Sequence, residues 1–518
     1  MNGIPLITAL TFTPLIGAVV LAAMNFQNKE LVRRLALGFG IVSLLTAGLV
    51  WKLFDPASVE LQFVERHAWI PTLGVDYFVG VDGLGLLLVL LTAIVTPMAI
   101  LVSWKIEKNV SIYFSLVLFL QAGLFGTFTA MNFFHWFIFW ELSLVPAFFL
   151  IKLWGGPQRS PAATQFFIYT MAGSVAMLLA FLGIYLATGT FDFIRLAELA
   201  RTGELASALN AKLGWYGLTR EQLPLVIFAG VFLGLAVKVP LIPFHTWLPT
   251  TYAEAPTATT MLLTGVMSKM GVYGFLRLLL PLFPEQMRMI LTPLLWLAVI
   301  TIIFSASAAF AQKDLKRMLA YSSINHLGYC LLGIFAVAKF TGNDAVLATE
   351  KAAALNGVFL QMFNHGLTAA TLFMFVGFLE QRSGGLRGLN DFGGLRKIAP
   401  VFCGLMGIAL FSSLGLPGLN GFVGEFLIFK GVFPLAPWAA GLSVIGLLVT
   451  AIFILTVLQR VFNGPLNEKW SNLPDLTLTE RALVVAPIVP MFVLGLWPRL
   501  VLDVITPTVV RMVEQLRF

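Results

Sequence analysis

The sequence has few of the cysteines and histidines that hold redox cofactors and structural metal ions. Its two cysteines, Cys330 and Cys403, stand alone in apolar segments, and no C-x-x-C pair or Cys/His cluster occurs. Iron–sulfur clusters and structural zinc therefore find no set of ligands. Neither a G-x-G-x-x-G fingerprint nor a Walker pattern is present, so nucleotide cofactors have no recognisable binding loop. We expect the chain to bind no cofactor, and any coupled redox chemistry to take place on other chains.

Charged residues are also scarce. They make up 11% of the 518 residues, whereas apolar residues make up 58%. Soluble domains carry about 25% charged residues. Apolar runs long enough to cross the roughly 30 Å hydrocarbon core as helices recur along the whole chain. The fold class predicted is an all-α polytopic membrane protein, and a soluble enzyme or a nucleic-acid binder is excluded. The net charge of +8 is then explained by membrane topology, because lysine and arginine collect in cytoplasmic loops.

Hydropathy predicts about fourteen transmembrane spans within a single membrane domain, residues 1–518. An even number of spans places both termini on one side of the membrane. On the other side lie the loops in which lysine and arginine gather, near residues 29–34, 105–108, 152–159, 313–317 and 382–397. That side is predicted to be cytoplasmic, and residues 54–80 are predicted to form an outer loop. The expected spans are 4–25, 32–53, 81–103, 111–130, 132–153, 164–187, 223–245, 256–280, 288–311, 316–338, 352–378, 400–432, 436–462 and 482–503.

Two of these spans contain helix-breaking residues. Pro240 and Pro243 interrupt the seventh span, and the run from Gly415 to Gly421 interrupts the twelfth. Broken helices at corresponding places are typical of transporters built from inverted repeats. We predict a first repeat at residues 111–280, spans four to eight, and a second at residues 288–462, spans nine to thirteen. Residues 191–213 combine apolar residues at helical spacing with charges, which predicts an amphipathic helix at the membrane interface.

Three titratable residues lie deep inside apolar spans: Glu141, Lys238 and Lys269. A lysine at the centre of a membrane helix costs about 2.5–3.5 kcal/mol on insertion scales, so such residues indicate function by default. The structural alternative is a carboxylate or ammonium that only pairs with a neighbouring helix. Glu141 has no partner within one turn of its own helix, which favours a functional role.

Four further residues extend this set: His245 at the seventh span's break, His326 and His365 in the tenth and eleventh spans, and Glu425 after the twelfth span's break. A single membrane histidine is often only packed and hydrogen-bonded, and Glu425 could simply stabilise the broken helix. We place Glu425 at the position in span twelve that Lys238 takes in span seven. A series Glu141, Lys238, Lys269, His326 or His365, Glu425 along the mid-membrane, linked by water, is what proton translocation requires.

Several stretches together resemble a known family, the antiporter-like subunits of respiratory and photosynthetic complex I, and among them most closely the M subunits. The matching stretches are FIFWELSLVP (137–146), KVPLIPFHTWLPTTYAEAPT (238–257), MSKMGVYGFLR (267–277), QKDLKRMLAYSSINHLGY (312–329), NHGLTAATLF (364–373) and GLPGLNGFVGEFLIFKG (415–431).

The resemblance implies fourteen helices, with the seventh and twelfth discontinuous, and a role for each residue. Glu141 would be the helix-five carboxylate that pairs with Lys238, and Lys269 the central lysine of helix eight. His326 and His365 would connect this lysine to Glu425, the terminal carboxylate. The related L subunits carry lysine at that last position, so Glu425 favours M. Tyr252 departs from the family's usual histidine, which makes the subfamily less secure.

The function implied is that of a proton-translocating membrane-arm subunit of a complex I-type NAD(P)H or ferredoxin:quinone oxidoreductase. Quinone, flavin and iron–sulfur clusters are then expected on partner subunits, and neighbouring antiporter-like chains and the lipid bilayer are the partners. The expected location is a bacterial plasma membrane or a cyanobacterial or plastid thylakoid. The alternatives are a subunit of an Mrp-type sodium/proton antiporter, a membrane subunit of a membrane-bound hydrogenase or formate hydrogenlyase, and a structural scaffold.

Overall fold

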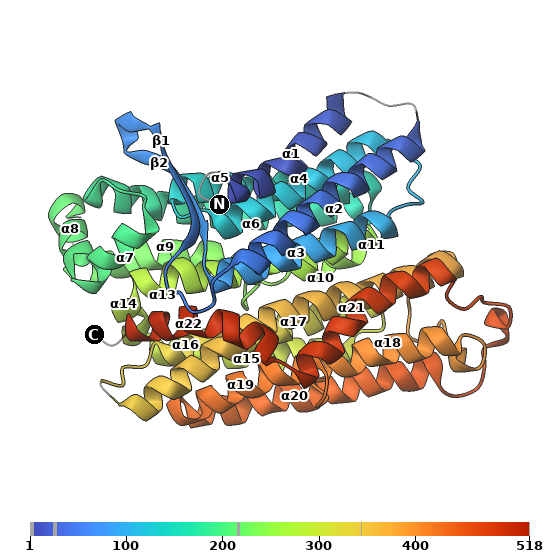
Figure 1. Ribbon diagram of the computed structural model, residues 1–518. Coiled ribbons are helices and arrows are strands. Elements are labelled where there is room, and N and C mark those ends of the chain that lie inside the picture. The colour runs from blue at the N-terminus through green and yellow to red at the C-terminus, as the bar shows by residue number, and fades with distance from the viewer. Residues whose placement is uncertain (1–4, 24–27, 215–217, 343, 517–518) are drawn as a thin grey trace.

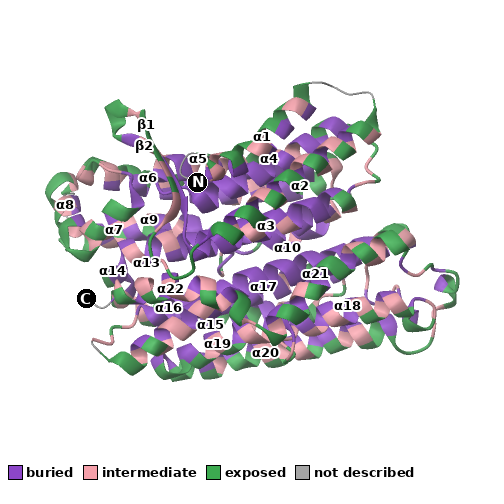
Figure 2. Ribbon diagram, in the orientation of Figure 1, coloured by how far each residue is buried: buried purple, intermediate pink, exposed green. Residues whose placement is uncertain are grey.

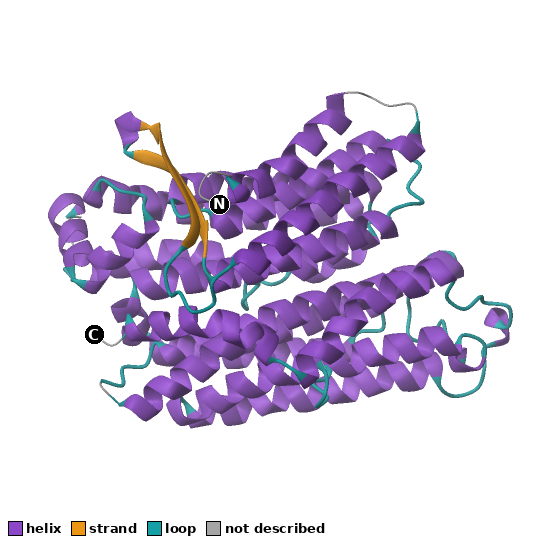
Figure 3. Cartoon of the chain, in the orientation of Figure 1, coloured by secondary structure: helices purple, strands orange, loops and turns teal. Residues whose placement is uncertain are grey.

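A computed structural model describes residues 5–23, 28–214, 218–342 and 344–516. Figure 1 shows long helices lying side by side, with the N-terminal elements above the C-terminal ones, and Figure 3 shows how little of the chain is not helical. Twelve helices among the described residues are long and apolar enough to cross a membrane. The two interrupted helices described below complete the fourteen expected spans. The outermost residues of the expected first span, 4, 24 and 25, lie outside the described residues.

The first part of the chain forms long helices that begin at side-chain caps. Asn28, Asp82 and Asn132 each accept hydrogen bonds from the backbone of the first turn that follows, which satisfies otherwise unpaired amides. The helices are α1 (Leu6–Ala23), α2 (Lys29–Leu53), α3 (Gly83–Val102), α4 (Val110–Thr129), α5 (Phe133–Trp154) and α6 (Arg159–Thr188).

Two connecting regions carry more structure than the sequence indicated. The expected outer loop 54–80 contains an antiparallel hairpin of β1 (Gln62–Ile70) and β2 (Val75–Val81) around the short helix η1 (Pro71–Leu73). The expected single amphipathic helix at 191–213 is two helices, α7 (Phe193–Arg201) and α8 (Glu204–Leu213). Gly203 separates them with a φ of 74°, a conformation that glycine adopts at little cost and that ends a helix.

The seventh span is broken where the prolines predicted it. Helix α9 (Gln222–Lys238) ends before Pro240, residues 239–246 are not α-helical, and α10 (Trp247–Glu254) follows. The next span is continuous from Thr257 to Leu282 but changes its helical pitch twice. It consists of α11 (Thr257–Leu262), the π-helical segment η2 (Leu263–Met267), α12 (Ser268–Gly274), the π-helical segment η3 (Phe275–Leu279) and α13 (Leu280–Leu282).

The second part of the chain repeats the pattern of long helices followed by a broken one. After α14 (Pro284–Met289) come α15 (Leu291–Ala311), α16 (Leu315–Val337) and α17 (Ala345–Ser383). The short helix η4 (Leu395–Lys397) precedes α18 (Pro400–Ser413), which is separated from α19 (Asn420–Leu435) by a turn in which Gly415 and Gly418 have positive φ. The remaining elements are α20 (Pro437–Val457), the π-helical segment η5 (Leu458–Phe462), η6 (Glu468–Trp470), α21 (Leu478–Leu496) and α22 (Arg499–Glu514).

The centre of the molecule is built from three helices that are buried on all sides. In the most apolar windows of 257–282, α16 and α17, 94%, 94% and 100% of residues are buried, which separates them from the half-exposed outer helices (Figure 2). Helix α17 packs against α16, α19, α3 and α22. Helix α22 was not expected as a separate element: the last span ends at Leu496, and α22 then buries one face with residues at intervals of four, Val501, Ile505, Val509 and Val513. The division into two inverted repeats stays a prediction.

Candidate functional site

Six of the seven residues predicted from the sequence lie on helices. Two of the six, Lys238 and Lys269, lie next to a break or a π-helical segment. Lys238 is the last residue of α9, and Lys269 follows η2 directly. Short π-helical segments occur mostly at functional sites. His326 is on α16, His365 on α17 and Glu425 on α19. All five side chains come from residues that are at most 7% exposed, so each sits in a low-dielectric environment.

Lys269 and His365 are in direct contact. The Nζ atom of Lys269 lies 2.8 Å from Nδ1 of His365, and it also donates a hydrogen bond to the carbonyl oxygen of Thr264. The Oγ atom of Ser268 is 3.4 Å from the same Nζ. An imidazole nitrogen can accept a proton from an ammonium group, because the neutral ring has one nitrogen lone pair free.

His326 joins His365 to Glu425. The two imidazole rings are 5.0 Å apart between centroids, and Nδ1 of His326 lies 3.0 Å from Oε1 of Glu425. The opposite nitrogen, Nε2, is 3.2 Å from Oγ of Ser413, the last residue of α18. The four predicted residues Lys269, His365, His326 and Glu425 therefore form one series that crosses from α12 through α17 and α16 to α19. We call them the central series.

Gln361 is a member of this site that sequence reasoning missed. Its Nε2 atom lies 3.3 Å from Oε1 of Glu425 and 3.4 Å from Nδ1 of His326. It precedes His365 by four residues on α17, and residues at that spacing share a helix face. A buried amide one turn from a buried histidine was the available signal. Ser413 was missed as well, and nothing in its apolar surroundings marks it.

Gly415 explains how the carboxylate of Glu425 fits beside the break in the twelfth span. A Cβ atom at Gly415 would lie 2.5 Å from Oε2 of Glu425, and the φ of this glycine is 79°. Both the close approach and the backbone conformation exclude other residues there without movement. The break thus brings the backbone against the carboxylate, in addition to interrupting the helix.

The expected ion pair between Glu141 and Lys238 is not formed in the structure, and this corrects the prediction. Among the described residues, no hydrogen bond within 3.5 Å and no ion pair within 4.0 Å joins the carboxylate of Glu141 to Nζ of Lys238. The Nζ atom of Lys238 instead lies 5.0 Å above the indole ring of Trp140. A cation is attracted to the face of an indole ring, so this contact replaces the ion pair. We call Glu141 and Lys238 the outlying pair.

One further prediction about position is corrected, and the relay role of His245 stays a prediction. Lys238 and Glu425 do not take the same place in their spans, because Lys238 ends the half helix before its break and Glu425 lies in the half helix after its break. His245, although 7% exposed, has no hydrogen-bond partner at Nδ1 among the described residues. Its ring lies near Phe304 and Tyr321, at 5.5 Å and 6.3 Å between centroids, and among the described residues no hydrogen bond joins it to the central series. Nowhere in the described ranges do three His, Cys, Asp or Glu side chains gather as a metal site requires.

Comparison with known proteins gives consistent matches over nearly the whole chain. Residues 130–453 match the family described as "NADH:quinone oxidoreductase/Mrp antiporter, TM". NADH-quinone oxidoreductase subunit M of Rhodobacter capsulatus is 37% identical, covering 98% of this chain and 96% of that protein. The F(420)H(2) dehydrogenase subunit M of Methanosarcina mazei is 38% identical, covering 96% of each.

Solved structures match to a similar extent. A chain of respiratory complex I from Thermus thermophilus with bound NADH is 28% identical and superimposes with a TM-score of 0.83, covering 98% of this chain and 99% of that one. A chain of the Mrp complex from Dietzia sp. superimposes with a TM-score of 0.81 over all of both chains at 20% identity, a likeness of fold alone.

Proposed function

The chain belongs to the NADH:quinone oxidoreductase/Mrp antiporter family of transmembrane proteins, and we propose that it is the M-type, proton-translocating subunit in the membrane arm of a complex I-type quinone oxidoreductase. It is an integral membrane protein that acts beside other antiporter-like subunits. Flavin, iron–sulfur clusters and quinone are held by partner chains, and this chain carries out no electron transfer itself. The relatives are named for two different electron donors, NADH for the Rhodobacter protein and F(420)H(2) for the Methanosarcina protein, which is consistent with a donor site on partner chains.

One observation supports the proposal above all: the titratable groups of the central series follow one another with a single gap, between the two histidine rings. A proton on Nζ of Lys269 can pass to Nδ1 of His365 over 2.8 Å. The step from His365 to His326 spans a ring separation of 5.0 Å, which a bridging water can serve. From His326 the proton reaches Oε1 of Glu425 over 3.0 Å. Glu425 then delivers it toward the outer side.

The outlying pair supplies the driving charge. Electron transfer to quinone on partner subunits alters the charge at one end of the membrane arm, and Glu141 and Lys238 move together or apart in response. Moving one charge against 100 mV costs about 2.3 kcal/mol. Two unit charges about 8 Å apart interact by about 2 kcal/mol at an effective dielectric constant near 20. A displaced charge on Lys238 is therefore strong enough to push a proton off Lys269.

The test is Lys269→Ala in the intact complex, with assembly checked on a native gel. In membrane vesicles we expect proton pumping and donor:quinone turnover to fall together by about a hundredfold, the scale of losing one proton-transfer group. The matched control is Lys430→Ala, which removes a lysine of the same chain that forms a peripheral ion pair with Glu350. That variant should pump as the wild type does.

Two outcomes contradict the proposal in different ways. Unchanged pumping by an assembled Lys269→Ala complex removes Lys269 from the proton route. Sodium/proton exchange without any quinone-linked activity in the wild type favours the Mrp-type alternative, and turnover coupled to hydrogen evolution favours the hydrogenase-type alternative.

A further inference from the structure

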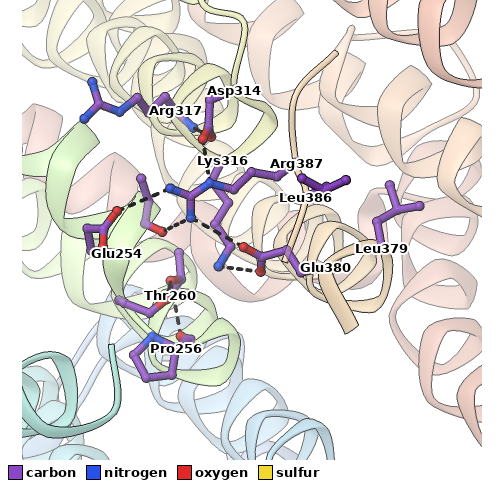
Figure 4. A network of polar contacts seen from close by, with 12 residues as sticks. Glu254, Pro256, Thr260, Asp314, Lys316, Arg317, Leu379, Glu380, Leu386 and Arg387 are labelled. Atoms are coloured by element: carbon purple, nitrogen blue, oxygen red, sulfur yellow. Dashed lines mark hydrogen bonds and ion pairs between the residues drawn. The ribbon is translucent and has the colours of Figure 1, made fainter. Parts of the chain in front are cut away.

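Arg387 lies outside the relay and connects three helices at one end of the molecule. It stands in the segment between α17 and η4. Its Nε atom is 2.5 Å from Oδ2 of Asp314, which caps α16, and Nη2 is 3.3 Å from Oε1 of Glu254, the last residue of α10. Nη1 is 3.4 Å from Oε1 of Glu380 near the end of α17. Figure 4 shows the guanidinium between these three carboxylates.

The attachment of Arg387 to α16 and α17 is rigid. Its carbonyl oxygen accepts a hydrogen bond from the amide of Leu315 at 2.9 Å, so its backbone is fixed to the first residue of α16. Glu380 also binds Nζ of Lys316 at 2.7 Å, and the side chain of Lys316 is only 4% exposed (Figure 4). Charge-assisted contacts of this kind are stronger than neutral ones and hold their geometry.

On its other side Arg387 holds α10, the second half of the broken seventh span. Nη1 donates to the carbonyl oxygen of Ala253 at 2.6 Å, next to the contact with Glu254. Glu254 in turn accepts hydrogen bonds from the amides of Gln158 and Gly156, both at 2.8 Å, in the turn between α5 and α6. The end of α10 is thus held between the helix that carries Glu141 and the helices that carry His326 and His365.

A stripe of buried hydroxyl groups leads from this point to Lys269. Thr260, Thr264 and Ser268 follow one another at intervals of four on one face of the helix, and each is at most 3% exposed. Thr260 donates to the carbonyl oxygens of Tyr252 and Ala255, in and just after α10. Thr264 shares a 3.0 Å hydrogen bond with Ser323 of α16 and accepts one from Lys269 through its carbonyl oxygen. We call these groups the hydroxyl stripe.

We propose that Arg387 is a positioning residue that clamps α10 against α16 and α17. The clamp closes the end of the hydroxyl stripe that begins at Thr260 to water from the side of the basic loops. Release of Arg387 from Glu254 lets α10 move and opens a water path from the side of the basic loops to Lys269. The loops at 152–159, 313–317 and 382–397, which the sequence assigns to one side, meet at this clamp. The inference rests on the proposed function in taking Lys269 as the group that receives the proton.

The test measures access to the stripe directly, with a cysteine at Ser323 as reporter. The chain has two cysteines, so Ser323→Cys combined with Cys330→Ser and Cys403→Ser leaves one thiol in it. In the assembled complex, a small sulfonated methanethiosulfonate, which does not cross membranes, is applied to inverted and to right-side-out vesicles. Adding Arg387→Gln should speed modification from the basic-loop side by about tenfold or more, the scale of losing one hydrogen bond to a charged group.

The matched control is Arg382→Gln. Arg382 is also a part-buried arginine at the same end, but it binds Glu480 at 2.5 Å and ties α17 to α21 instead of α10. Its loss should leave the modification rate of the reporter unchanged. Equal acceleration in both variants, or acceleration from both sides of the membrane, overturns the proposal, because it reports general loosening. No acceleration in Arg387→Gln overturns it too.

A second variant decides the matter if Arg387→Gln does not assemble. Glu254→Gln keeps the backbone contact of Glu254 with Gly156 and removes the negative charge opposite Arg387, and its single amide oxygen can accept from only one of Arg387 and the amide of Gln158 in the geometry of the two carboxylate oxygens. It should speed modification severalfold from the basic-loop side, and a wild-type rate contradicts the clamp. Modification is measured without turnover, so its result is independent of the proposed function. If Arg387→Gln speeds modification as expected but Lys269→Ala pumps protons like the wild type, only the proton relay is refuted.

Discussion

The central series and the outlying pair are both titratable groups whose polar atoms are buried in membrane helices, although Glu141 as a residue is partly exposed, and their surroundings are opposite. Lys269, His365, His326 and Glu425 contact one another or a carbonyl, hydroxyl or amide group at hydrogen-bond distance, with one ring-to-ring gap. Glu141 and Lys238 have no hydrogen-bond partner among the described residues, and an indole ring is the contact of the lysine.

This difference teaches what each region is suited to do. Proton transfer requires donors and acceptors within hydrogen-bond reach, which the central series provides. An unpaired buried charge is costly, so its position and protonation respond strongly to any change in nearby charge. We therefore propose the outlying pair as the responsive element and the central series as the conducting one.

The largest effect is expected from breaking the end of the central series with Glu425→Gln. Glutamine keeps the shape beside Gly415 but cannot take the proton from His326, so pumping should fall by about a hundredfold or more. Proton pumping in vesicles, normalised to assembled complex, is the measurement. The same exchange at Glu350, which pairs with Lys430 at a helix surface, serves as the control. Pumping that survives Glu425→Gln would mean that the series ends elsewhere.

A smaller effect is expected on stability. The same substitution, lysine to methionine, should change the free energy of unfolding differently in the two regions. Lys269→Met leaves the carbonyl of Thr264 and Nδ1 of His365 without their partner, which should cost about 1–3 kcal/mol. Lys238→Met removes a buried amine that has no hydrogen-bond partner, so the free energy of unfolding should stay the same or rise. The thermal disassembly midpoint of the solubilised complex, compared with that of the wild type, gives the answer. If Lys238→Met is the more damaging variant, the contrast between the two regions does not hold.

The sequence predicted the helices and their breaks, and the physical reason is that both are local. Apolar length sets the spans, and Pro240 and the glycines near Gly415 cannot continue a helix wherever they occur. The identity of the buried titratable residues followed from the cost of burying them. The gap at residues 202–203 between α7 and α8 shows the limit even locally, because one glycine in a polar helix is tolerated in many proteins.

The resemblance implied that His326 and His365 connect Lys269 to Glu425, but the residues alone could not predict the contacts between these groups, because they depend on how each helix is rotated about its axis. Helices α16 and α17 are buried on every side, so no apolar stripe shows which face meets which neighbour. The contact between Lys269 and His365 joins residues 96 positions apart, and the separation of Glu141 from Lys238 depends on where the ring of Trp140 lies. Gln361 was missed for the same reason: its importance arises only from its neighbours.

The smallest effect is expected at His245, which the sequence assigned to the relay and which the structure sets beside aromatic rings. His245→Gln should change pumping by less than about threefold, because its ring lies beside Phe304 and Tyr321 and no hydrogen bond of the described residues joins it to the central series. The comparison is with Glu425→Gln in the same vesicles. A loss at His245 as large as that at Glu425 would place the break of the seventh span within the conducting path. The boundary between the responsive and the conducting region would then lie at Lys238 itself, because Lys238 is the last residue of α9 before the break.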